Sequence, residues 1–546
     1  MLKVNLLSHI EEASQQAAAA TAQRAELQLG FGRCGWLQSE PLSGRVVLQR
    51  WSAGQAETLT PPPYSVRSRV HEYGGGAWCL GPSGAWFVNA ADQGIYLQPW
   101  EGGTPLLWWR ARGCRYGDLT FDAIHQRLLA VEEQHPDQQL ASQPGQDQQS
   151  PNQQVRNRLV AISVRHCRRQ VLDAGEDFYA APSVAPDGSA LAWISWVHPF
   201  QPWLGTRLHW AHLDASGMPT QRRCLAEGCQ SALLESLQQP RFAPDGSLWV
   251  ISDRSGWWNL YRIRQPAADT PEWQPIEPRT AEYAGAPWQL GARSYAFIDP
   301  QRVVMSYLQQ GSYHWGIYHV ETQHWQPLQG NWGELASIGS DGSTVYALAA
   351  DLSATGLLLR GEPTGHVRME LPGLGEQVAA ASQPVSFAGD DGETVHGCYY
   401  PAQHCSGRLL VQLHGGPTAY RAAVADAQRL FWLQQGYAVL ELNYRGSSGY
   451  GRDYRQRLRQ QWGELDAADA CAAGYYALTQ GWAQPGGLAL RGNSSGGYTL
   501  LRALQRSDHP FSAAACHYGI GDLARLAATT HKFERRYLDW LIGDPV

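Results

Sequence analysis

A short turn motif that recurs along the first two thirds of the chain places the strongest constraint on its fold. Between about residues 30 and 375, turns rich in Pro, Asp and Gly alternate with short apolar runs. Clear copies are Ala185–Gly188 and Ala243–Gly246, the second followed by the strand-like run Ser247–Ser252. Asp and Gly suit β-turns, and β-branched and aromatic residues suit strands. Turns about 40 to 65 residues apart match four-stranded blades, so this region predicts a β-propeller of about seven blades.

Two packed β-sandwiches are the alternative for this region. Sandwiches do not return to the same turn at such regular intervals, so the propeller is favoured. One segment, His135–Arg158, is dense in Gln, Asp, Pro and Ser and has almost nothing to bury. We predict that it is a disordered insertion between two strands of one blade, and we assign it no function.

The last third of the chain alternates buried strands with helices. Apolar runs at Leu409–Leu413, Ala438–Leu442 and Phe511–Gly519 are typical of buried strands. The stretches from 452 to 479 and from Gly497 to Arg506 are predicted to be helical. Strands that alternate with helices predict a doubly wound, mostly parallel α/β sheet. The predicted domains are an N-terminal helical segment (1–29), the propeller (30–375) and an α/β domain (376–546).

Composition excludes several classes of function. The chain has 43 basic and 49 acidic residues and a formal charge of -6, so it has no basic excess for binding nucleic acid. It has no run of 18 or more apolar residues, which argues against a membrane partner. The ten cysteines are scattered, without the Cys-x-x-Cys spacing of zinc sites. We therefore predict reduced thiols, a cytoplasmic location, and no metal or other cofactor.

The pentapeptide Gly492–Gly496 carries the sharpest chemical signal. It has the Gly-x-Ser-x-Gly pattern and lies between a predicted strand and a predicted helix. The glycines permit a strained turn that exposes the hydroxyl of Ser494 at the carboxyl edge of the sheet. Only Ser494 fits the register, because the residue two positions before Ser495 is Asn493. Ser494 is thus the predicted nucleophile of an α/β-hydrolase domain.

A second glycine-rich turn follows the strand Leu409–Leu413. In His414–Pro417, a backbone N–H is placed where, together with the N–H of Ser495, it can bind a substrate carbonyl oxygen. A plain strand-to-helix turn is the alternative. His414 precedes the serine and lies on the wrong loop for a base, so a structural, hydrogen-bonded role is predicted for it.

Several motifs together resemble the prolyl oligopeptidase family, in particular its acylaminoacyl-peptidase and dipeptidyl-aminopeptidase branch. They are Arg408–Tyr420, Asn443–Arg452, Trp462–Gly463, Arg491–Tyr498, Arg69–Gly76, Ala243–Tyr261 and Thr530–Glu534. The resemblance implies a serine peptidase whose propeller caps the active site and admits only short peptides. It also implies that Ser494 is the nucleophile and that Gly416 and Ser495 supply the oxyanion N–H groups.

The sequence departs from the family after the nucleophile. An α/β hydrolase places its triad in the order Ser, Asp or Glu, then His. Here His509, His517 and His531 follow Ser494, and none has an acid at suitable spacing. His517, near a strand end, is the alternative base. We expect the chain to be truncated, with the triad Asp and His beyond Val546, and the chain itself to be nearly inactive.

Substrate selection is less constrained by the sequence. An exopeptidase that takes a free amino end needs a carboxylate for the ammonium, and Glu72 in the propeller is the candidate. A blade residue hydrogen-bonded within its sheet is the alternative for Glu72. Two other functions stay open: a carboxylesterase on the same fold, and an inactive interaction protein built on the propeller. The sequence also leaves open whether substrates have a free or a blocked amino end. It does not distinguish a monomer from a homo-oligomer.

Overall fold

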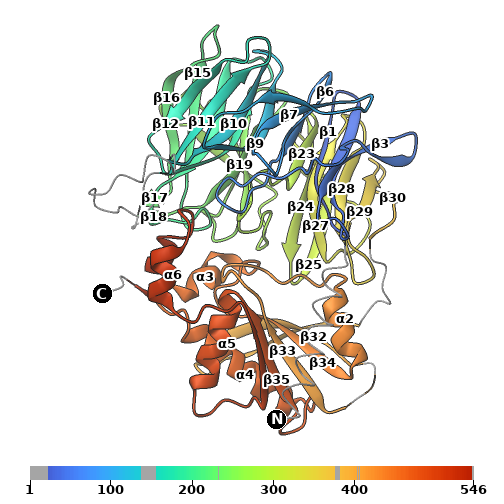
Figure 1. Ribbon diagram of the computed structural model, residues 1–546, viewed down its shortest axis with the longest axis vertical. Helices are drawn as coiled ribbons and strands as arrows, with labels where there is room; N and C mark the ends of the chain where they lie inside the picture. Colours follow the sequence, from blue (N-terminus) through green and yellow to red (C-terminus); the bar gives the residue numbers. More distant parts are fainter. Residues whose placement is uncertain are drawn as a thin grey trace.

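The computed structural model describes residues 22–136, 155–230, 233–374, 381–402, 404 and 406–543. These residues form a β-propeller, drawn from blue to yellow in Figure 1, and an α/β domain, drawn in orange and red below it. In the described part of the chain, no helix is both long enough and apolar enough to cross a bilayer.

The described residues of the propeller form seven four-stranded antiparallel sheets, one for each blade, as predicted. The first four blades comprise β1 (Arg24–Gly30), β2 (Arg33–Ser39), β3 (Val46–Ser52), β4 (Gln55–Thr58); β5 (Trp78–Leu80), β6 (Gly84–Val88), β7 (Ile95–Pro99), β8 (Leu106–Trp109); β9 (Cys114–Asp122), β10 (Arg127–Gln134), β11 (Arg156–Ser163), β12 (Arg169–Ala174); and β13 (Phe178–Val184), β14 (Ala190–Trp196), β15 (Arg207–Leu213), β16 (Pro219–Glu227). The other blades comprise β19 (Leu237–Phe242), β20 (Leu248–Ser252), β21 (Asn259–Arg264), β22 (Glu272–Ile276); β23 (Tyr295–Asp299), β24 (Arg302–Gln309), β25 (Ser312–His319), β26 (His324–Pro327); and β27 (Glu334–Ser340), β28 (Val345–Ala350), β29 (Leu357–Gly361), β30 (Val367–Leu371). A small ribbon of β17 (Cys229–Gln230) and β18 (Leu233–Leu234) precedes the fifth blade.

A bulge on the first strand of most blades joins neighbouring blades near the propeller axis. The bulge residues with positive φ are Glu26, Asp118, Ala181, Gln239 and Ser337. The Glu26 carboxylate accepts a hydrogen bond from Ala77 N at 3.0 Å, in the next blade. Asp118 accepts one from Ala181 N at 2.5 Å in the same way. The bulges of Glu26 and Asp118 therefore direct a carboxylate toward the next blade, where it accepts a hydrogen bond.

Two predictions about the propeller need correction or lie outside the structure. The predicted helical segment 1–29 is wrong for residues 24–29, which belong to β1, the first strand of the ring, because Ala25, Leu27 and Leu29 alternate with polar residues. Residues 1–21 lie outside the described residues. Residues 137–154 of the predicted insertion do so too, while its end, 156–158, belongs to β11 and pairs with β10.

The α/β domain is built on a mixed sheet. Its strands, which number six in the described residues, follow the order β31-β32-β34-β33-β35-β36, and the last four are parallel. They are β31 (Gln383–Ala388), β32 (Thr394–Tyr400), β33 (Arg408–Leu413), β34 (Tyr437–Asn443), β35 (Leu488–Asn493) and β36 (Ala513–His517). The helices are α2 (Ala427–Gln434), α3 (Gly451–Arg455), η2 (Gln456–Leu458, a 3-10 turn), α4 (Leu465–Thr479), α5 (Ser495–Gln505), α6 (Leu523–Thr529) and α7 (Tyr537–Ile542).

The order of this sheet puts the two chemically interesting turns next to each other. Strands β33 and β35 are neighbours, and both end at the same edge because they are parallel. The predicted strand at Phe511–Gly519 forms as β36, but it is not buried, because its residues alternate between half-buried and exposed. It is the edge strand of the described sheet, so one of its sides lacks a covering strand.

The two domains meet at a buried ion network. Arg455, at the end of α3, is fully buried, and its guanidinium lies 2.5 Å from an oxygen of Asp253 in the propeller. The same guanidinium stacks 3.8 Å above the ring of Trp258. Glu282 of the propeller accepts a hydrogen bond from Gly451 N at 3.0 Å. These contacts fix the propeller against the hydrolase domain.

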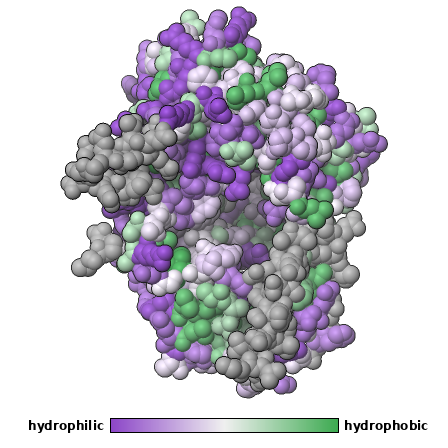
Figure 2. Space-filling view, viewed as in Figure 1, coloured by the Kyte–Doolittle hydropathy of each residue, from purple (hydrophilic) through white to green (hydrophobic). Residues whose placement is uncertain are grey.

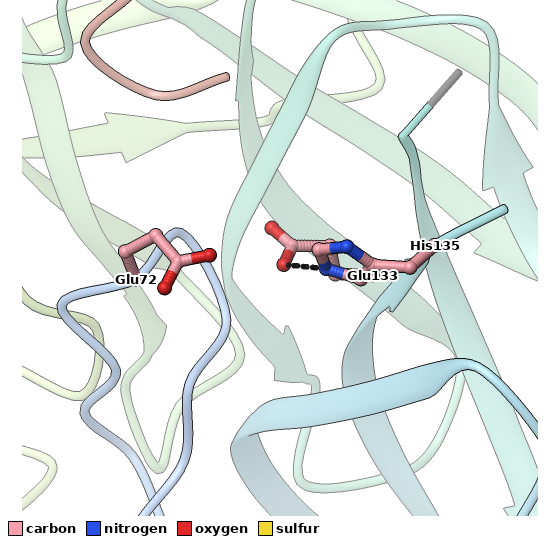
Figure 3. Close-up of side chains that lie close together, drawn as sticks. All are labelled: Glu72, Glu133 and His135. Atoms are coloured by element: carbon pink, nitrogen blue, oxygen red, sulfur yellow. Dashed lines mark hydrogen bonds and ion pairs between the residues drawn. The ribbon is translucent and has the colours of Figure 1, made fainter. Parts of the chain in front are cut away.

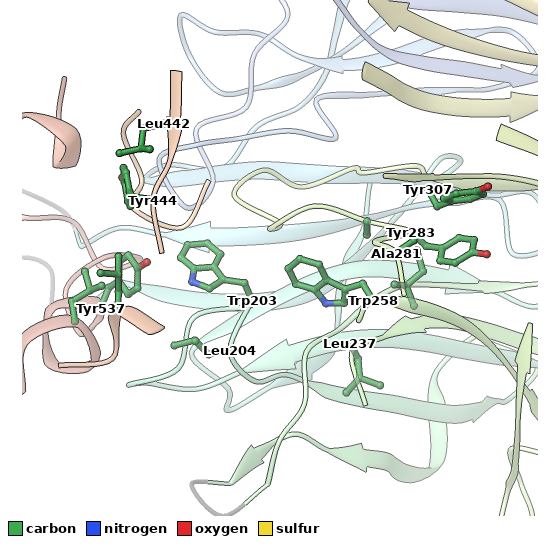
Figure 4. Close-up of a cluster of buried hydrophobic side chains, with 14 of the residues drawn as sticks. Trp203, Leu204, Leu237, Trp258, Ala281, Tyr283, Tyr307, Leu442, Tyr444 and Tyr537 are labelled. Carbon is green, nitrogen blue, oxygen red and sulfur yellow. The ribbon is translucent and has the colours of Figure 1, made fainter. Parts of the chain in front are cut away.

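Aromatic side chains form the second contact between the domains. In Figure 4, Trp203 of the propeller faces Tyr537 of α7, and Tyr444 of the hydrolase domain lies beside them. The rings of Trp203 and Tyr537 are 5.4 Å apart in an edge-to-face arrangement. Nearby, Trp288 Nε1 donates a hydrogen bond to the carbonyl oxygen of Thr418 at 2.6 Å. The propeller thereby contacts the loop that follows the glycine-rich turn at residue 416.

Candidate active site

Ser494 occupies a strained turn between β35 and α5. Its backbone has φ 52° and ψ -122°, a conformation that costs free energy for any residue with a side chain. A Cβ on Gly492 would lie 2.2 Å from the carbonyl oxygen of Gly496, and a Cβ on Gly496 would lie 2.5 Å from that of His414. Neither position has room for a side chain, so the two glycines of the motif are required by close backbone approach. Ser494 itself is only half-buried.

The glycine-rich turn after β33 lies against the serine. A Cβ built on Gly415 would be 3.5 Å from the Cβ of Ser494. Gly416, the next residue, has φ +128°. The backbone N–H groups of Gly416 and Ser495 have no acceptor among the described residues. Ser495 is the first residue of α5, where the helix dipole favours negative charge. The turn and the helix end together can receive an oxyanion.

His414 supports this turn from beneath. It is buried, with Nδ1 2.7 Å from the carbonyl oxygen of Gly415 and Nε2 2.8 Å from Ser447 Oγ. Its ring stacks on Tyr444 with the centroids 4.4 Å apart. Burial lowers the pKa of His414 to about 4, so the ring is neutral at pH 7. These contacts agree with the structural role that the sequence predicts.

The three histidines that follow Ser494 in the sequence lie in different surroundings. The backbone of His517 touches the serine directly, because Ser494 N donates to the His517 carbonyl oxygen at 3.1 Å. His531 lies at the propeller interface, with Nε2 3.7 Å from a carboxylate oxygen of Glu534. His509 stacks on Phe511. Among the described residues, the hydroxyl of Ser494 makes no hydrogen bond to an imidazole ring.

The comparison with known proteins agrees with this geometry. Residues 424–545, which include Ser494, match the model of the prolyl oligopeptidase family. The crystal structure of puromycin hydrolase is 29% identical to this chain, with a TM-score of 0.87 over 97% of this chain and 83% of that one. A puromycin-hydrolyzing peptidase of Mycobacterium tuberculosis is 30% identical, with a TM-score of 0.86 and the same coverage. The chain belongs to the prolyl oligopeptidase family.

Curated relatives match about a quarter of the chain. Dipeptidyl aminopeptidase BIII of Pseudoxanthomonas mexicana is 29% identical over 140 residues, which are 25% of this chain and 20% of the relative. The acylamino-acid-releasing enzyme of Arabidopsis thaliana is 31% identical over 122 residues, 22% of this chain and 16% of the relative. The matched segments thus span a fifth or less of these relatives' own length.

In this member of the prolyl oligopeptidase family, Glu72 lies in a group of ionisable side chains. Ligand atoms of Glu72, Glu133 and His135 all lie within 4.8 Å of one another (Figure 3). A cation already occupies the group: Arg115 Nη1 is 2.6 Å from Glu72 and 3.4 Å from Glu133. Glu133 is also 2.7 Å from His135 Nε2. Arg115 and His135 thus pair with the carboxylates of the group, and Glu72 itself lies in a turn outside the blade strands. Its role toward a substrate amine stays a prediction.

A cavity of about 800 Å³, which we call the chamber, lies between the two domains. It is lined by β1, by β27, by the propeller loop 285–292 and by hydrolase residues between Arg421 and Ala427. The surface in Figure 2 is recessed at the level where the domains meet. The chamber comes close to the nucleophile, because Trp288 in its wall bonds to Thr418, three residues after Gly415.

Of the propeller residues that reach the hydrolase domain, Trp288 and Glu334 carry no signal in the sequence. Trp288 and Glu334 line the chamber, and Asp253 holds Arg455 at the interface. No local motif marks Trp288 or Glu334. Asp253 lies in a segment that resembles the family, next to a pair of tryptophans in a blade turn. Its partner Arg455 is more than 200 residues away, so the sequence does not reveal the ion pair.

Proposed function

We propose that this protein is a serine peptidase that hydrolyses short peptides through an acyl-enzyme on Ser494. The Oγ of Ser494 attacks the carbonyl carbon of the peptide bond, the C–N bond breaks, and the amine leaves with a proton. Water then hydrolyses the ester and restores the hydroxyl. The observation that carries the proposal is the strained, half-buried serine between β35 and α5, against the turn at Gly415.

The oxyanion of each tetrahedral intermediate would be bound by two backbone N–H groups. We assign them to Gly416 and Ser495, whose N–H groups lack acceptors among the described residues. Donors of this kind stabilise developing charge and typically contribute about 10²- to 10³-fold to a rate. The names of the relatives, which include a dipeptidyl aminopeptidase, an acylamino-acid-releasing enzyme and a puromycin hydrolase, support amide bonds of short peptides as the substrate class.

We further propose that the 546-residue chain acylates slowly. A serine hydroxyl without a neighbouring base is a weak nucleophile at neutral pH. Within the described residues, no imidazole is hydrogen-bonded to Ser494. The oxyanion donors and substrate binding alone would then supply the residual rate, which is about 10³- to 10⁴-fold above water in enzymes lacking a triad member.

A fluorophosphonate probe tests the nucleophile. The unaltered chain should be labelled slowly but measurably, and Ser494→Ala should abolish labelling. Ser386→Ala, which removes a serine on the far strand β31, is the matched control and should label like the parent. Labelling that survives Ser494→Ala would overturn the proposal. Aminoacyl p-nitroanilides compared with a p-nitrophenyl ester separate a peptidase from a carboxylesterase.

We also propose a cytoplasmic location. The nine cysteines among the described residues are all free thiols, and four of them are buried. This usage suits a reducing compartment. Fractionation of cells that produce the tagged chain would test the location.

A further inference from the structure

The outer edge of the second blade is the least protected strand edge of the propeller. In each of the seven blades, the fourth strand is outermost and has a neighbouring strand on one side only among the described residues. Six of these strands contain a charged residue or a proline, and both discourage pairing with another chain. Examples, one from each strand, are Glu57, Asp173, Arg222, Glu272, Pro327 and Arg368. The seventh, β8, has the sequence Leu-Leu-Trp-Trp and contains neither.

The side chains of β8 divide into an exposed pair and a packed pair. The two leucines, at 106 and 107, are 60% and 50% exposed. The ring of Trp108 lies edge-to-face against that of Trp86, with the centroids 6.1 Å apart. Trp109 Nε1 donates a hydrogen bond to the Tyr116 hydroxyl at 2.9 Å. Because the tryptophans hold the strand in place, pairing with a partner would need little further ordering.

The outer side of the β8 backbone is also available. In the described part of the chain, β8 pairs with β7 alone, and the backbone hydrogen bonds outside the regular strands involve none of residues 106–109. A strand added on this side would satisfy the outward N–H and C=O groups and remove the leucines from water. An added strand is therefore the partner that this edge fits best.

The charges at the two ends of β8 favour a second copy of this chain as the source of that strand. Glu101 lies in the exposed turn before β8, and its carboxylate has no hydrogen bond or ion pair within the described residues. Arg110 directly follows the strand, and its side chain is 55% exposed although it contacts Asp92 at 3.3 Å. Two antiparallel copies related by a two-fold axis bring each acidic end to the basic end of the other. A parallel pair would bring like charges together.

We propose that two copies of this chain pair antiparallel through β8, so that their second blades form one sheet with four strands from each copy. Each copy contributes a strand of four residues, so the interface is small. The dimer is then weak and reversible, with a dissociation constant of about 10 to 100 µM. This assembly goes beyond the proposed peptidase function and does not depend on it.

The edge strand β36 of the hydrolase domain is the competing site for self-association. Its exposed residues are Ala514 and Cys516, which bury less apolar surface on pairing than leucines do. Ala514→Lys places a charge on that edge and leaves β8 unaltered. This variant therefore distinguishes the two edges.

Sedimentation equilibrium from about 1 to 200 µM tests the dimer. The parent and Ala514→Lys should both change from monomer to dimer over this range, and Leu106→Lys should weaken the dimer at least about 10-fold. Leu107→Thr keeps a residue suited to a strand and should weaken the dimer less. Unchanged urea midpoints for both leucine variants show that the fold survives the substitutions.

Hydrogen exchange of backbone amides tests the pairing itself. Amides of residues 106–109 should become protected as the concentration of the parent rises, and amides of β36 should not. The proposal is overturned if the parent stays monomeric at about 200 µM, or if Ala514→Lys abolishes the dimer while Leu106→Lys keeps it. Full protection of residues 106–109 at about 1 µM would also overturn it, because the edge would then be covered within a single chain.

Discussion

The region between the domains has two sides, which we call walls and which are built by different means. The hydrolase wall, which carries Ser494, is shaped by backbone: at Gly492 and Gly496 neighbouring main-chain atoms leave no room for a side chain. The propeller wall is shaped by side chains, such as Trp288 and Glu334, which project from a ring of repeated blades. The wall that carries the chemistry is therefore fixed by steric contact, whereas the opposite wall is set by the choice of side chains.

This difference predicts two kinds of response to mutation. A change on the hydrolase wall moves the backbone of the strained serine, so its effect on Ser494 should be nearly all-or-none. A change on the propeller wall leaves the blade backbone in place, so its effect should be graded. The contrast explains how one catalytic domain can serve ligands of different chemistry when the propeller side chains vary.

The largest effect is expected for Gly496→Ala. The new methyl group would lie 2.5 Å from the His414 carbonyl oxygen and 2.9 Å from that of Leu413, so β33 and α5 must separate. We expect fluorophosphonate labelling of Ser494 to fall by more than about 1,000-fold, and stability to fall by about 1 to 3 kcal/mol. Gly521→Ala is the control, since no atom lies within 4 Å of a Cβ there. Equal labelling of both variants would remove the contrast between the walls.

The next largest effect is expected where the two walls are joined, at Arg455. Arg455→Met removes the guanidinium that lies against the buried carboxylates of Asp253 and Glu282, and leaves only Arg452, 3.6 Å from Asp253. Breaking a buried pair in this way costs about 3 to 5 kcal/mol. Urea unfolding followed by tryptophan fluorescence should show the loss as a lower midpoint. Arg457→Met is the matched control, because that arginine forms an exposed pair with Glu393 and should cost about 1 kcal/mol or less. Similar midpoints for the two variants would show that the interface does not depend on Arg455.

The sequence predicts the hydrolase wall better than the propeller wall, and the reason is physical. The motif Gly492–Gly496 contains its own steric requirement, so strand, turn, Ser494 and helix follow from local sequence. The helix begins at Ser495, two residues before its predicted start at Gly497, because the first turn of a helix after a strained serine has no separate signal. Blade number follows from turn spacing, since each blade is a local unit.

The propeller wall depends on contacts that are distant in sequence. Trp288 and Thr418 are 130 residues apart, and only closure of the ring and docking of the domains bring them together. Glu334 looks like any polar residue at the start of a strand. Glu72 is conspicuous in sequence, yet Arg115, 43 residues later, pairs with it. The sequence predicts helix for the first strand because an alanine-rich run at residues 17–20 directly precedes its short alternating pattern.

The hydrolase wall should also respond to pH through Asp466, at the start of α4. Its carboxylate is fully buried and accepts hydrogen bonds from Gly463 N at 2.6 Å and from the Thr499 hydroxyl. Burial raises the pKa of Asp466 to about 6. The folded state thus holds the proton more tightly than the unfolded state, and the associated stability is present at low pH and lost as the pH rises through about 6.

Asp466→Asn should remove this pH dependence. The free energy of unfolding of the parent, relative to the variant, should fall by at most about 3 kcal/mol between pH 4 and pH 7. Urea titrations of both proteins at several pH values give the difference directly, and other titrating groups cancel in it. A difference that rises with pH, or stays constant, would show that Asp466 is ionised throughout.

The smallest effect is expected on the propeller wall, for Trp288→Phe. The variant keeps an aromatic ring in the chamber but loses the hydrogen bond from Nε1 to Thr418, which steadies the loop after Gly416. Loss of one such bond costs about 1 kcal/mol, so labelling of Ser494 should slow by about fivefold and no more. Trp108→Phe, in the outer strand of the second blade, is the control for replacing a tryptophan by phenylalanine elsewhere in the propeller. It should not alter the labelling of Ser494. If Trp288→Phe abolished labelling as completely as Gly496→Ala does, the propeller would be part of the catalytic geometry, and the two walls would have to be regarded as one.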